Sequence, residues 1–445
     1  MQQPHINIGL ATGDKLRFSL LGNFFQLGTQ NVFSGNFSSE IRNGKILLKG
    51  ETGEFLFTSG VTFKPDNYNV ELFKIFGVKI GVNFHWESAK DLLYTGSLKL
   101  IIEGDKLTAV NIIPLEDYLL GVISSEMNPK SHHEFLKAHA VISRSWLMSQ
   151  ITDRKKSAGR EAPNNDEYGE DEIIKWYDRG DHKNYDVCAD DHCQRYQGIS
   201  KNISESVRDA IWQTRGLALV YNDKVFDARY SKCCGGKTEL FENVWSEKDK
   251  SVIPSLFDYK FPPDNFEENL KSEENAAKWI YGSPEAFCNV AESEFLEEIL
   301  VEFDQKTKDF FRWRVEFSQA EISKLIAEKS GIDFGEILDL IPVERGESGR
   351  LIKLKIVGVK AEKIVGKELE IRRILSETHL YSSAFVVEKI IGKGDIPEKF
   401  ILRGAGWGHG VGLCQIGAAV MARLNYRFDE ILAHYYPGIQ IKRVY

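Results

Sequence analysis

The stretch Pro114-Leu-Glu-Asp-Tyr-Leu-Leu-Gly-Val-Ile-Ser-Ser-Glu-Met-Asn-Pro129 predicts a helix at the centre of this 445-residue chain. Proline suits the first turn of a helix, and the acidic pair that follows favours its positive end. Leu115, Leu119 and Val122 fall at intervals of four and three, which places them on one helical face. The next position on that face is Glu126. A helix that buries this stripe would therefore carry the Glu126 carboxyl group to the interior or to a cleft wall.

A carboxyl group in such a place is a candidate for chemistry. Desolvation there favours the protonated acid, and general acid catalysis at a glycosidic oxygen requires a carboxylic acid of this kind. The alternative is that the helix frays after Ser124 and leaves Glu126 as a solvated C-terminal residue. The stripe alone leaves both interpretations open.

Composition limits the function classes. The chain is 42% hydrophobic and 27% charged, as in an ordinary folded protein, and its length allows two or three domains. The formal net charge of −8 argues against a binder of duplex nucleic acid, which usually has a basic excess. No run approaches the roughly 20 apolar residues that span a bilayer. The first residues, Met-Gln-Gln-Pro-His-Ile-Asn, show neither a basic nor an apolar segment, so no signal peptide is visible.

The pattern on both sides of the helix predicts an α+β chain in four parts. Residues 1–93 are expected to be β-rich, because short alternating stretches are broken by turns such as Asn43-Gly44. Residues 94–245 are expected to form a mixed core that contains a pair of helices. Residues 246–400 would be a second α/β subdomain inserted before the C-terminal motif, and residues 401–445 a Gly-rich motif and helices that complete the core.

A second helix follows the first one at once. Ser131 and Glu134 have the spacing of a capping box, and apolar positions from Phe135 onward continue the helix to about residue 153. Lys137 and Arg144 lie seven residues apart and so share another face of this helix.

A polar and acidic stretch, 155–185, is expected to be an exposed insertion that is ordered only in part. Two histidines and two cysteines lie at and beyond its end: His182, Cys188, His192 and Cys193. These side chains can form a tetrahedral zinc site, which would be structural because protein ligands fill all four positions. Cys188 and Cys193 could instead form a small-loop disulfide or remain buried thiols.

Two glycine-rich motifs follow. Cys233-Cys-Gly-Gly-Lys-Thr-Glu239 lacks the spacing of a phosphate loop, so its glycines indicate either close approach to a ligand or a tight turn. Gly404-Ala-Gly-Trp-Gly-His-Gly-Val-Gly-Leu-Cys-Gln-Ile-Gly417 holds six glycines around Trp407 and His409. Trp407 offers an apolar plate on which sugars stack, and His409 and Gln415 offer polar contacts. A purely structural role for His409 remains the alternative.

Together these segments resemble the SpoIID/LytB family, named for stage II sporulation protein D and the amidase enhancer. The resemblance covers about residues 94–445. The matching segments follow the order in which the family has them: Tyr94–Leu98 with Pro114–Met127, Phe135–Trp146, Gly235–Glu239 with Asn243–Trp245, and Gly406–Ala418 with Ile431–Gly438.

The resemblance implies a peptidoglycan lytic transglycosylase that cleaves glycan strands lacking stem peptides. Glu126 matches the family's catalytic glutamate. It would protonate the leaving glycosidic oxygen and then, as a base, help the sugar's own 6-hydroxyl to close an anhydro ring, so one carboxylate suffices. The family also has a zinc site in the region of the four His and Cys residues. Substrate contacts are expected from basic positions on the second helix and from the C-terminal segments: Lys137, Arg144, Trp407, His409, Gln415 and Tyr435.

The resemblance also implies alternatives. The enhancer branch of the family suggests a non-catalytic glycan-binding module, or an activator of a cell-wall amidase. A zinc-dependent hydrolase would need an open ligand position, which the closed four-residue set does not offer. His139 stands where many relatives have Gln, and Cys414 where Ser or Thr is common. The family implies the cell envelope or periplasm, whereas no export signal is visible. Neither a cofactor for the chemistry itself nor a nucleic-acid partner is expected.

Overall fold

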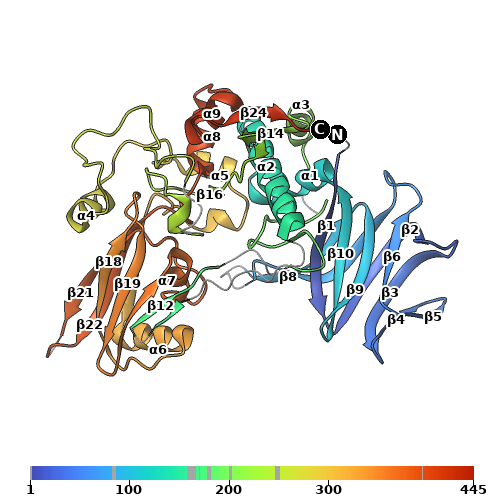
Figure 1. The fold of residues 1–445 in the computed structure, drawn as a ribbon, viewed down its shortest axis with the longest axis horizontal. Coiled ribbons are helices and arrows are strands. Elements are labelled where there is room, and N and C mark those ends of the chain that lie inside the picture. Colours follow the sequence, from blue (N-terminus) through green and yellow to red (C-terminus); the bar gives the residue numbers. More distant parts are fainter. Residues whose placement is uncertain are drawn as a thin grey trace.

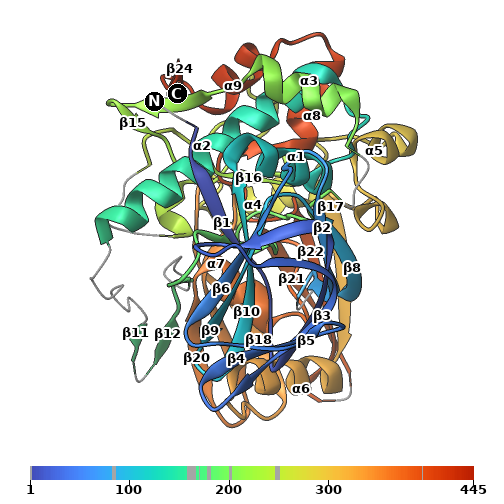
Figure 2. The same ribbon diagram turned by 90° about the vertical axis from the view of Figure 1, so that its right-hand side faces the viewer.

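The computed structural model describes residues 3–82, 87–157, 167–169, 171–177, 182–199, 203–245, 251–392 and 394–445. It has an α+β fold, as the sequence predicts. Figure 1 shows a large N-terminal sheet at one end, a helical centre, and a second group of sheets at the other end. Both chain termini lie beside the helical centre and close to each other in the two perpendicular views (Figures 1 and 2).

The N-terminal sheet is antiparallel from β1 to β10, and the short strand β13 (Val187–Cys188) joins β1 in parallel. The predicted Asn43-Gly44 turn is confirmed, because both residues have positive φ angles, 50° and 70°, and the flanking residues pair. The Phe33 ring packs in the core against other aromatic rings. The strands are β1 His5–Gly13, β2 Lys15–Gln26, β3 Val32–Arg42, β4 Lys45–Gly50, β5 Gly53–Phe57, β6 Gly60–Pro65, β7 Leu72–Ile80, β8 Ser88–Tyr94, β9 Ser97–Glu103 and β10 Lys106–Pro114.

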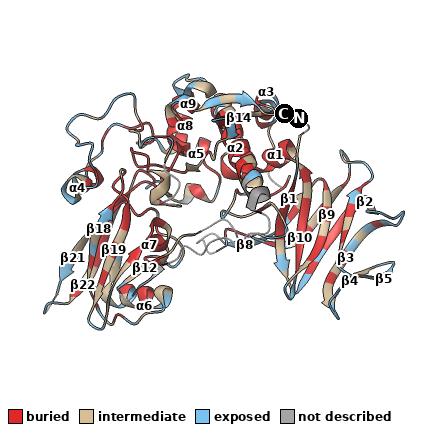
Figure 3. Cartoon of the chain, viewed as in Figure 1, coloured by how far each residue is buried: buried red, intermediate tan, exposed pale blue. Residues whose placement is uncertain are grey.

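Helices α1 (Leu115–Glu126) and α2 (His133–Ser157) follow the sheet directly. Leu115, Leu119 and Val122 are completely buried, so the predicted apolar stripe is confirmed. The two helices pack against each other and against α3 (Glu205–Gln213). Figure 3 shows that buried residues run through this helical centre.

The capping box predicted at Ser131 is wrong. The helix begins at His133, and the Ser131 hydroxyl is buried without a hydrogen-bond partner. The Glu134 carboxylate accepts the main-chain amide of Phe428 at 2.7 Å and pairs with Lys137. A contact with a distant segment therefore takes the side chain that local capping would have used.

The later part of the chain forms smaller sheets with helices packed on them. Strand β12 (Glu172–Ile174) comes from the acidic stretch, pairs in parallel with β20 and buries Ile174. Part of the stretch expected to be exposed therefore lies in a sheet, while residues 158–166 and 178–181 lie outside the described residues. The other elements are β11 Glu167–Tyr168, α4 Glu273–Tyr281, α5 Ser293–Ile299, β17 Arg312–Ser318, α6 Gln319–Ser330, β18 Ile337–Arg345, β19 Leu351–Gly358, β20 Glu362–Gly366, α7 Glu368–Ile374, β21 Phe385–Ile391 and β22 Pro397–Ala405, with 3-10 turns at Phe241–Asn243 and Asp304–Lys306.

The C-terminal segment returns to the helical centre. Its helices pack on α2, and its last strand pairs with β14. The Gly-rich motif is therefore built in beside the helix pair, whereas the domain boundaries at 93, 245 and 400 stay predictions. Within the described ranges, no helix combines the length and apolar character that crossing a membrane requires. The elements are β14 Leu217–Tyr221, β15 Lys224–Val225, β16 Tyr230–Ser231, β23 Leu413–Cys414, α8 Gln415–Arg423, α9 Phe428–Tyr435 and β24 Gln440–Arg443.

Candidate functional site

Glu126 is the last residue of α1. One of its carboxylate oxygens accepts hydrogen bonds, and the other accepts none from the described residues. The residue is only 8% exposed. Its Oε1 accepts hydrogen bonds from the Arg195 main-chain amide at 3.0 Å and from the Tyr230 hydroxyl at 3.4 Å. No donor among the described residues bonds to Oε2. A proton on this carboxyl group therefore belongs on Oε2, because the two donors occupy Oε1.

A network of buried charges surrounds the end of α1. Lys232 Nζ lies 3.1 Å from the Glu126 main-chain carbonyl and 2.9 Å from an Asp304 carboxylate oxygen. Its charge faces the negative end of a helix that has no basic residue in its own last turn. The Arg195 guanidinium lies 3.3 Å from Asp304 and pairs with Asp191. Burial raises the pKa of Asp304, but Lys232 and Arg195 outweigh it and hold that pKa below its ordinary value.

The Tyr230 hydroxyl belongs to a chain of hydrogen bonds that ends at Glu126. Tyr118 donates to the Gln194 side-chain oxygen at 3.3 Å, and the Gln194 amide donates to the Tyr230 oxygen at 3.2 Å. Burial, and then the nearby Glu126, keep the pKa of Tyr230 well above its ordinary value. The hydroxyl therefore stays protonated and acts as a donor to the carboxylate.

His139 lies on another side of Tyr230, with the ring centroids 5.0 Å apart. Its Nε2 is 2.9 Å from the Gln415 amide nitrogen, and its Nδ1 is 3.3 Å from the Ser143 hydroxyl. Burial, with a smaller contribution from Lys232, lowers the pKa of His139 to about 3. The ring is therefore neutral near pH 7 and accepts from Gln415, which is itself buried.

The Gly-rich motif is tied to the strand that carries Tyr230. Tyr230 pairs with Leu413 across β16 and β23. Three residues further on, the main chains of Cys233 and Trp407 bond to each other in both directions, at 3.1 and 2.7 Å. Through this pairing, the position of the motif is coupled to the residues that contact Glu126.

The alternate glycines let this loop close around a protein side chain. Every second residue from Gly406 to Gly412 has a φ angle between 73° and 96°, a region that other residues rarely adopt. A side chain at Gly410 would strike Arg350. The Arg350 guanidinium is buried and donates to the Gly408 carbonyl at 3.1 Å. The described neighbours of these glycines are thus protein groups rather than an open cradle for a ligand.

Trp407 and His409 are half-buried and lie against other aromatic rings. The Trp407 ring has Phe310 at 4.7 Å and Tyr381 at 4.4 Å, measured between centroids. His409 accepts a main-chain amide at Nδ1, at 3.0 Å, and its ring lies 4.5 Å from Trp245. Both keep some exposed surface, so their contact with substrate stays a prediction.

Three other expected contact residues are engaged inside the protein. Arg144 has no exposed side-chain surface and forms two hydrogen bonds to the Glu116 carboxylate, at 3.0 and 2.7 Å. Tyr435 is completely buried and donates to an aspartate at 2.6 Å. Lys137 lies 5.0 Å from the centre of the Phe428 ring in α9. A role in substrate binding does not fit the burial of Arg144 and Tyr435. Arg144 links α2 to α1, and Tyr435 links α9 to the loop that carries Asp258.

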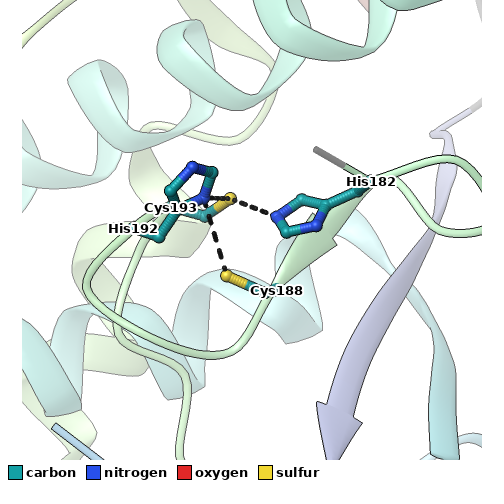
Figure 4. A group of neighbouring side chains, drawn as sticks. All are labelled: His182, Cys188, His192 and Cys193. Carbon is teal, nitrogen blue, oxygen red and sulfur yellow. Dashed lines mark hydrogen bonds between the residues drawn. The ribbon is translucent and has the colours of Figure 1, made fainter. Parts of the chain in front are cut away.

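The four residues expected to bind zinc lie together, and we call them the local cluster: His182, Cys188, His192 and Cys193. Figure 4 shows their side chains pointing toward one another, and their ligand atoms all lie within 4.8 Å of each other. Cys193 Sγ is 3.5 Å from His182 Nε2 and 3.4 Å from His192 Nδ1. Tetrahedral sulfur and nitrogen ligands of zinc stand about 3.5 Å apart, and both cysteines are free thiols. The donor set and its spacing therefore fit zinc.

Comparison with known proteins supports the SpoIID family. The family model for the stage II sporulation protein (SpoIID) matches residues 103–221, which include both helices, Glu126 and the local cluster. Stage II sporulation protein D of Bacillus subtilis is 24% identical over 75% of this chain and 76% of its own length. Residues 103–221 therefore form a SpoIID-type domain, and the similarity to stage II sporulation protein D supports the same family.

Two other relatives extend this comparison. An uncharacterized protein of Brachyspira hyodysenteriae is 26% identical over 78% of this chain and 72% of its own length. The amidase enhancer of Bacillus subtilis is 25% identical over 55% of this chain, but over only 33% of its own length. A second family model, a domain of unknown function (DUF8618), matches residues 239–412, so much of the chain beyond the SpoIID match also has a known sequence family.

The sequence did not predict the residues that surround Glu126 at the end of α1. Arg195 follows the local cluster by two positions, and Tyr230 and Lys232 stand three positions and one position before Cys233. Their nearness to those motifs was the available signal, but no spacing relates them to Glu126. Asp304 lies in a 3-10 turn and carries no motif signal at all.

Proposed function

We propose that this chain is a peptidoglycan lytic transglycosylase that cleaves glycan strands, with strands lacking stem peptides as its substrate class, and that Glu126 is its acid and base. One observation carries the proposal. Glu126 has two donors on Oε1 and none on Oε2 among the described residues. The carboxyl group is thereby oriented to deliver a proton from a fixed position. Similarity to stage II sporulation protein D supports this assignment.

In the first step, the proton on Oε2 passes to the glycosidic oxygen, and the bond between that oxygen and C1 breaks. The Arg195 amide and the Tyr230 hydroxyl stabilise the negative charge that then forms on the carboxylate. In the second step, the carboxylate takes the proton of the sugar's 6-hydroxyl while that oxygen bonds to C1. An anhydro ring closes, Glu126 regains its proton, and no water is consumed.

The neighbouring carboxylates favour this route over hydrolysis, which commonly uses a second carboxylate. Asp191 and Asp304 both pair with Arg195, and Asp304 also pairs with Lys232. Both are therefore occupied in ion pairs. An intramolecular hydroxyl needs no such partner, because the substrate supplies its own nucleophile.

The local cluster enters the proposal as a structural zinc site. His182, Cys188, His192 and Cys193 would hold the ion, and four protein ligands leave no position for a catalytic water. The hydrogen bond with Cys193 and those with the histidines lower the pKa of Cys188 to about 2 despite burial, so a thiolate is available as a ligand. By fixing the segment from His182 to Cys193, the ion would keep the Arg195 main-chain amide directed at Glu126.

A relative named amidase enhancer favours a second candidate function. In that case the chain would bind glycan and activate a cell-wall amidase without cleaving the strand itself. The small exposed fraction of Glu126 is compatible with this alternative. Either function places the site of action in the cell envelope, where peptidoglycan lies.

Replacing Glu126 by Gln tests the proposal, because the amide keeps the shape of the side chain but cannot donate a carboxylic proton. We expect release of anhydro-sugar ends from peptide-free glycan strands to fall by about 100- to 10,000-fold, measured by mass spectrometry. Binding to the strands should persist, and Glu205→Gln, at an exposed glutamate, should have wild-type activity. Unchanged turnover in Glu126→Gln would contradict the proposal. An inactive wild type that, like Glu126→Gln, stimulates an amidase would support the alternative.

A further inference from the structure

Four buried side chains from distant parts of the chain meet behind the strand that contacts Glu126. We call them the remote cluster: Cys234, Asp258, Cys288 and Cys414. Each is at most 2% exposed, and their ligand atoms all lie within 4.8 Å of one another. Sequence reasoning did not connect them, since each stands in a different segment of the chain.

The distances within the remote cluster match the edges of a tetrahedral metal site. Cys234 Sγ lies 3.6 Å from Cys288 Sγ and 3.4 Å from Asp258 Oδ2. Around a zinc ion with bonds of about 2.3 Å to sulfur and 2.0 Å to oxygen, two sulfurs stand about 3.8 Å apart, and a sulfur and an oxygen about 3.5 Å apart. The ligand atoms are therefore already spaced as one mononuclear ion requires.

Neighbouring groups orient the ligands. Tyr435 donates to Asp258 Oδ1 at 2.6 Å, which turns Oδ2 toward the sulfurs. The main-chain amide of Cys288 donates to that Oδ2 at 3.2 Å, and the amide of Cys234 lies 3.2 Å from Cys414 Sγ. Hydrogen bonds of this kind fix carboxylates and thiolates at metal centres. A side chain at Gly417 would collide with both Tyr435 and Asp258, so the helix can approach only because this residue is glycine.

The local charge also calls for a cation. The Asp258 carboxylate is completely buried, and among the described residues the basic group that approaches it is His434 Nε2, 3.8 Å away. A buried carboxylate without a close cationic partner is costly. Arg312 donates to main-chain carbonyls and interacts electrostatically with Cys288. Its single positive charge offsets half of the net −2 that three thiolates, a carboxylate and a divalent ion would carry together.

Two other uses of these thiols fit less well. A disulfide between Cys234 and Cys288 would need the sulfurs at about 2 Å, whereas they are 3.6 Å apart and free. It would also leave Asp258 and Cys414 without a role. A multi-iron cluster stands between its cysteine ligands and holds them farther apart than one ion does, which the close spacing disfavours.

We propose that Cys234, Asp258, Cys288 and Cys414 bind one zinc ion in a closed structural site, separate from the local cluster. The ion would join the segment that carries Tyr230 and Lys232 to the residue that caps the start of α8 and to the loops on both sides of α4. This inference goes beyond the proposed function, because the site takes no part in glycan cleavage. Its role is to hold the segment that contacts Glu126 against the C-terminal helices.

The zinc content of the purified full-length chain tests the proposal without an activity assay. After dialysis against metal-free buffer, native mass spectrometry and elemental analysis should find one zinc ion in the variant His182→Ala/Cys188→Ala, which has lost the local cluster. Cys288→Ala should contain one ion fewer than the wild type. Cys233→Ala is the matched control, because Cys233 is a buried neighbour outside the four-residue set, and it should keep the wild-type zinc content.

A double variant without metal would overturn the proposal, as would an unchanged zinc content in Cys288→Ala or a Cys234–Cys288 disulfide in the purified chain. If Cys288→Ala does not fold, the double variant still decides, because its substitutions lie outside the remote cluster. Cobalt(II) added to the metal-depleted double variant should produce the charge-transfer and visible bands of a tetrahedral thiolate complex. Their absence would also contradict the assignment.

Discussion

The local and remote clusters offer similar ligand atoms, but they differ in how their members are spaced along the chain. His182 and Cys193 of the local cluster are 11 positions apart, whereas Cys234 and Cys414 of the remote cluster are 180 positions apart. In each cluster, one cysteine stands two positions from a residue that contacts Glu126. Arg195 follows the local cluster, and Lys232 precedes Cys234. The end of α1 is thus held from two sides, once by a local turn and once by tertiary structure.

This difference has an energetic consequence. The entropy of closing a loop grows with the logarithm of its length. Closing a loop of 180 residues rather than 11 removes about 2.5 kcal/mol more conformational entropy from the unfolded chain. An ion in the remote cluster should therefore stabilise the fold more than an ion in the local cluster, although both sites would use four protein ligands.

The largest expected effect on the free energy of unfolding comes from removing one cysteine of each cluster in turn. Cys414→Ala should lower the free energy of unfolding by about 2.5 kcal/mol more than Cys193→Ala, because the remote cluster closes the longer loop. Urea unfolding of the zinc-loaded proteins, followed by tryptophan fluorescence, measures this difference. Cys233→Ala controls for the loss of a buried thiol as such and should cost less than Cys414→Ala. Equal effects of Cys414→Ala and Cys233→Ala would mean that the remote cluster does not stabilise the fold as one unit.

The same contrast explains what the sequence could predict. The stripe of α1, the Asn43-Gly44 turn and the grouping of the local cluster depend on residues close together in the chain, and the structure has all three. The Ser131 cap failed because a distant amide, that of Phe428, takes the Glu134 carboxylate. Periodicity and motif spacing carry no information about such contacts.

The candidate site divides in the same way. The place of Glu126 at the end of a buried stripe was predictable from helical periodicity, but its partners Tyr230 and Lys232 reach it from about 105 positions away. The glycines of the C-terminal motif were recognisable as a special loop. Their closure around Arg350 could not be predicted, because Arg350 lies in the distant turn before β19 and belongs to no motif.

A smaller effect on stability is expected from His139 in α2, which contacts Gln415, the residue after Cys414. His139 contacts Gln415 and Tyr230, and burial together with Lys232 lowers its pKa to about 3, against about 6.5 in an unfolded chain. As the pH falls, the unfolded state binds the proton first. Stability from this group is therefore complete above about pH 6.5 and is lost progressively down to about pH 3. The loss at pH 5 is about 2 kcal/mol.

His139→Gln removes this titration and keeps an amide that can bond to Gln415. We expect the difference in unfolding free energy between pH 7 and pH 5 to be about 2 kcal/mol smaller in the variant than in the wild type. Urea unfolding at the two pH values measures it. An identical pH dependence in both proteins would show that the contact between α2 and the C-terminal helices does not depend on a neutral His139.

The smallest expected effect concerns the two hydrogen bonds that Glu126 accepts, one from the segment after the local cluster and one from the segment before the remote cluster. From the local side, Glu126 receives a main-chain amide of Arg195, which no side-chain substitution removes. From the remote side it receives the Tyr230 hydroxyl at 3.4 Å, a long hydrogen bond worth about 1 kcal/mol. Tyr230→Phe should therefore lower kcat for glycan cleavage by about fivefold, with KM and zinc content unchanged, because the ring still packs against His139. Steady-state kinetics with peptide-free strands measures this change. A rise in KM with normal kcat would instead assign the hydroxyl to substrate binding, and a loss of zinc would show that the substitution disturbs the remote cluster rather than the acid.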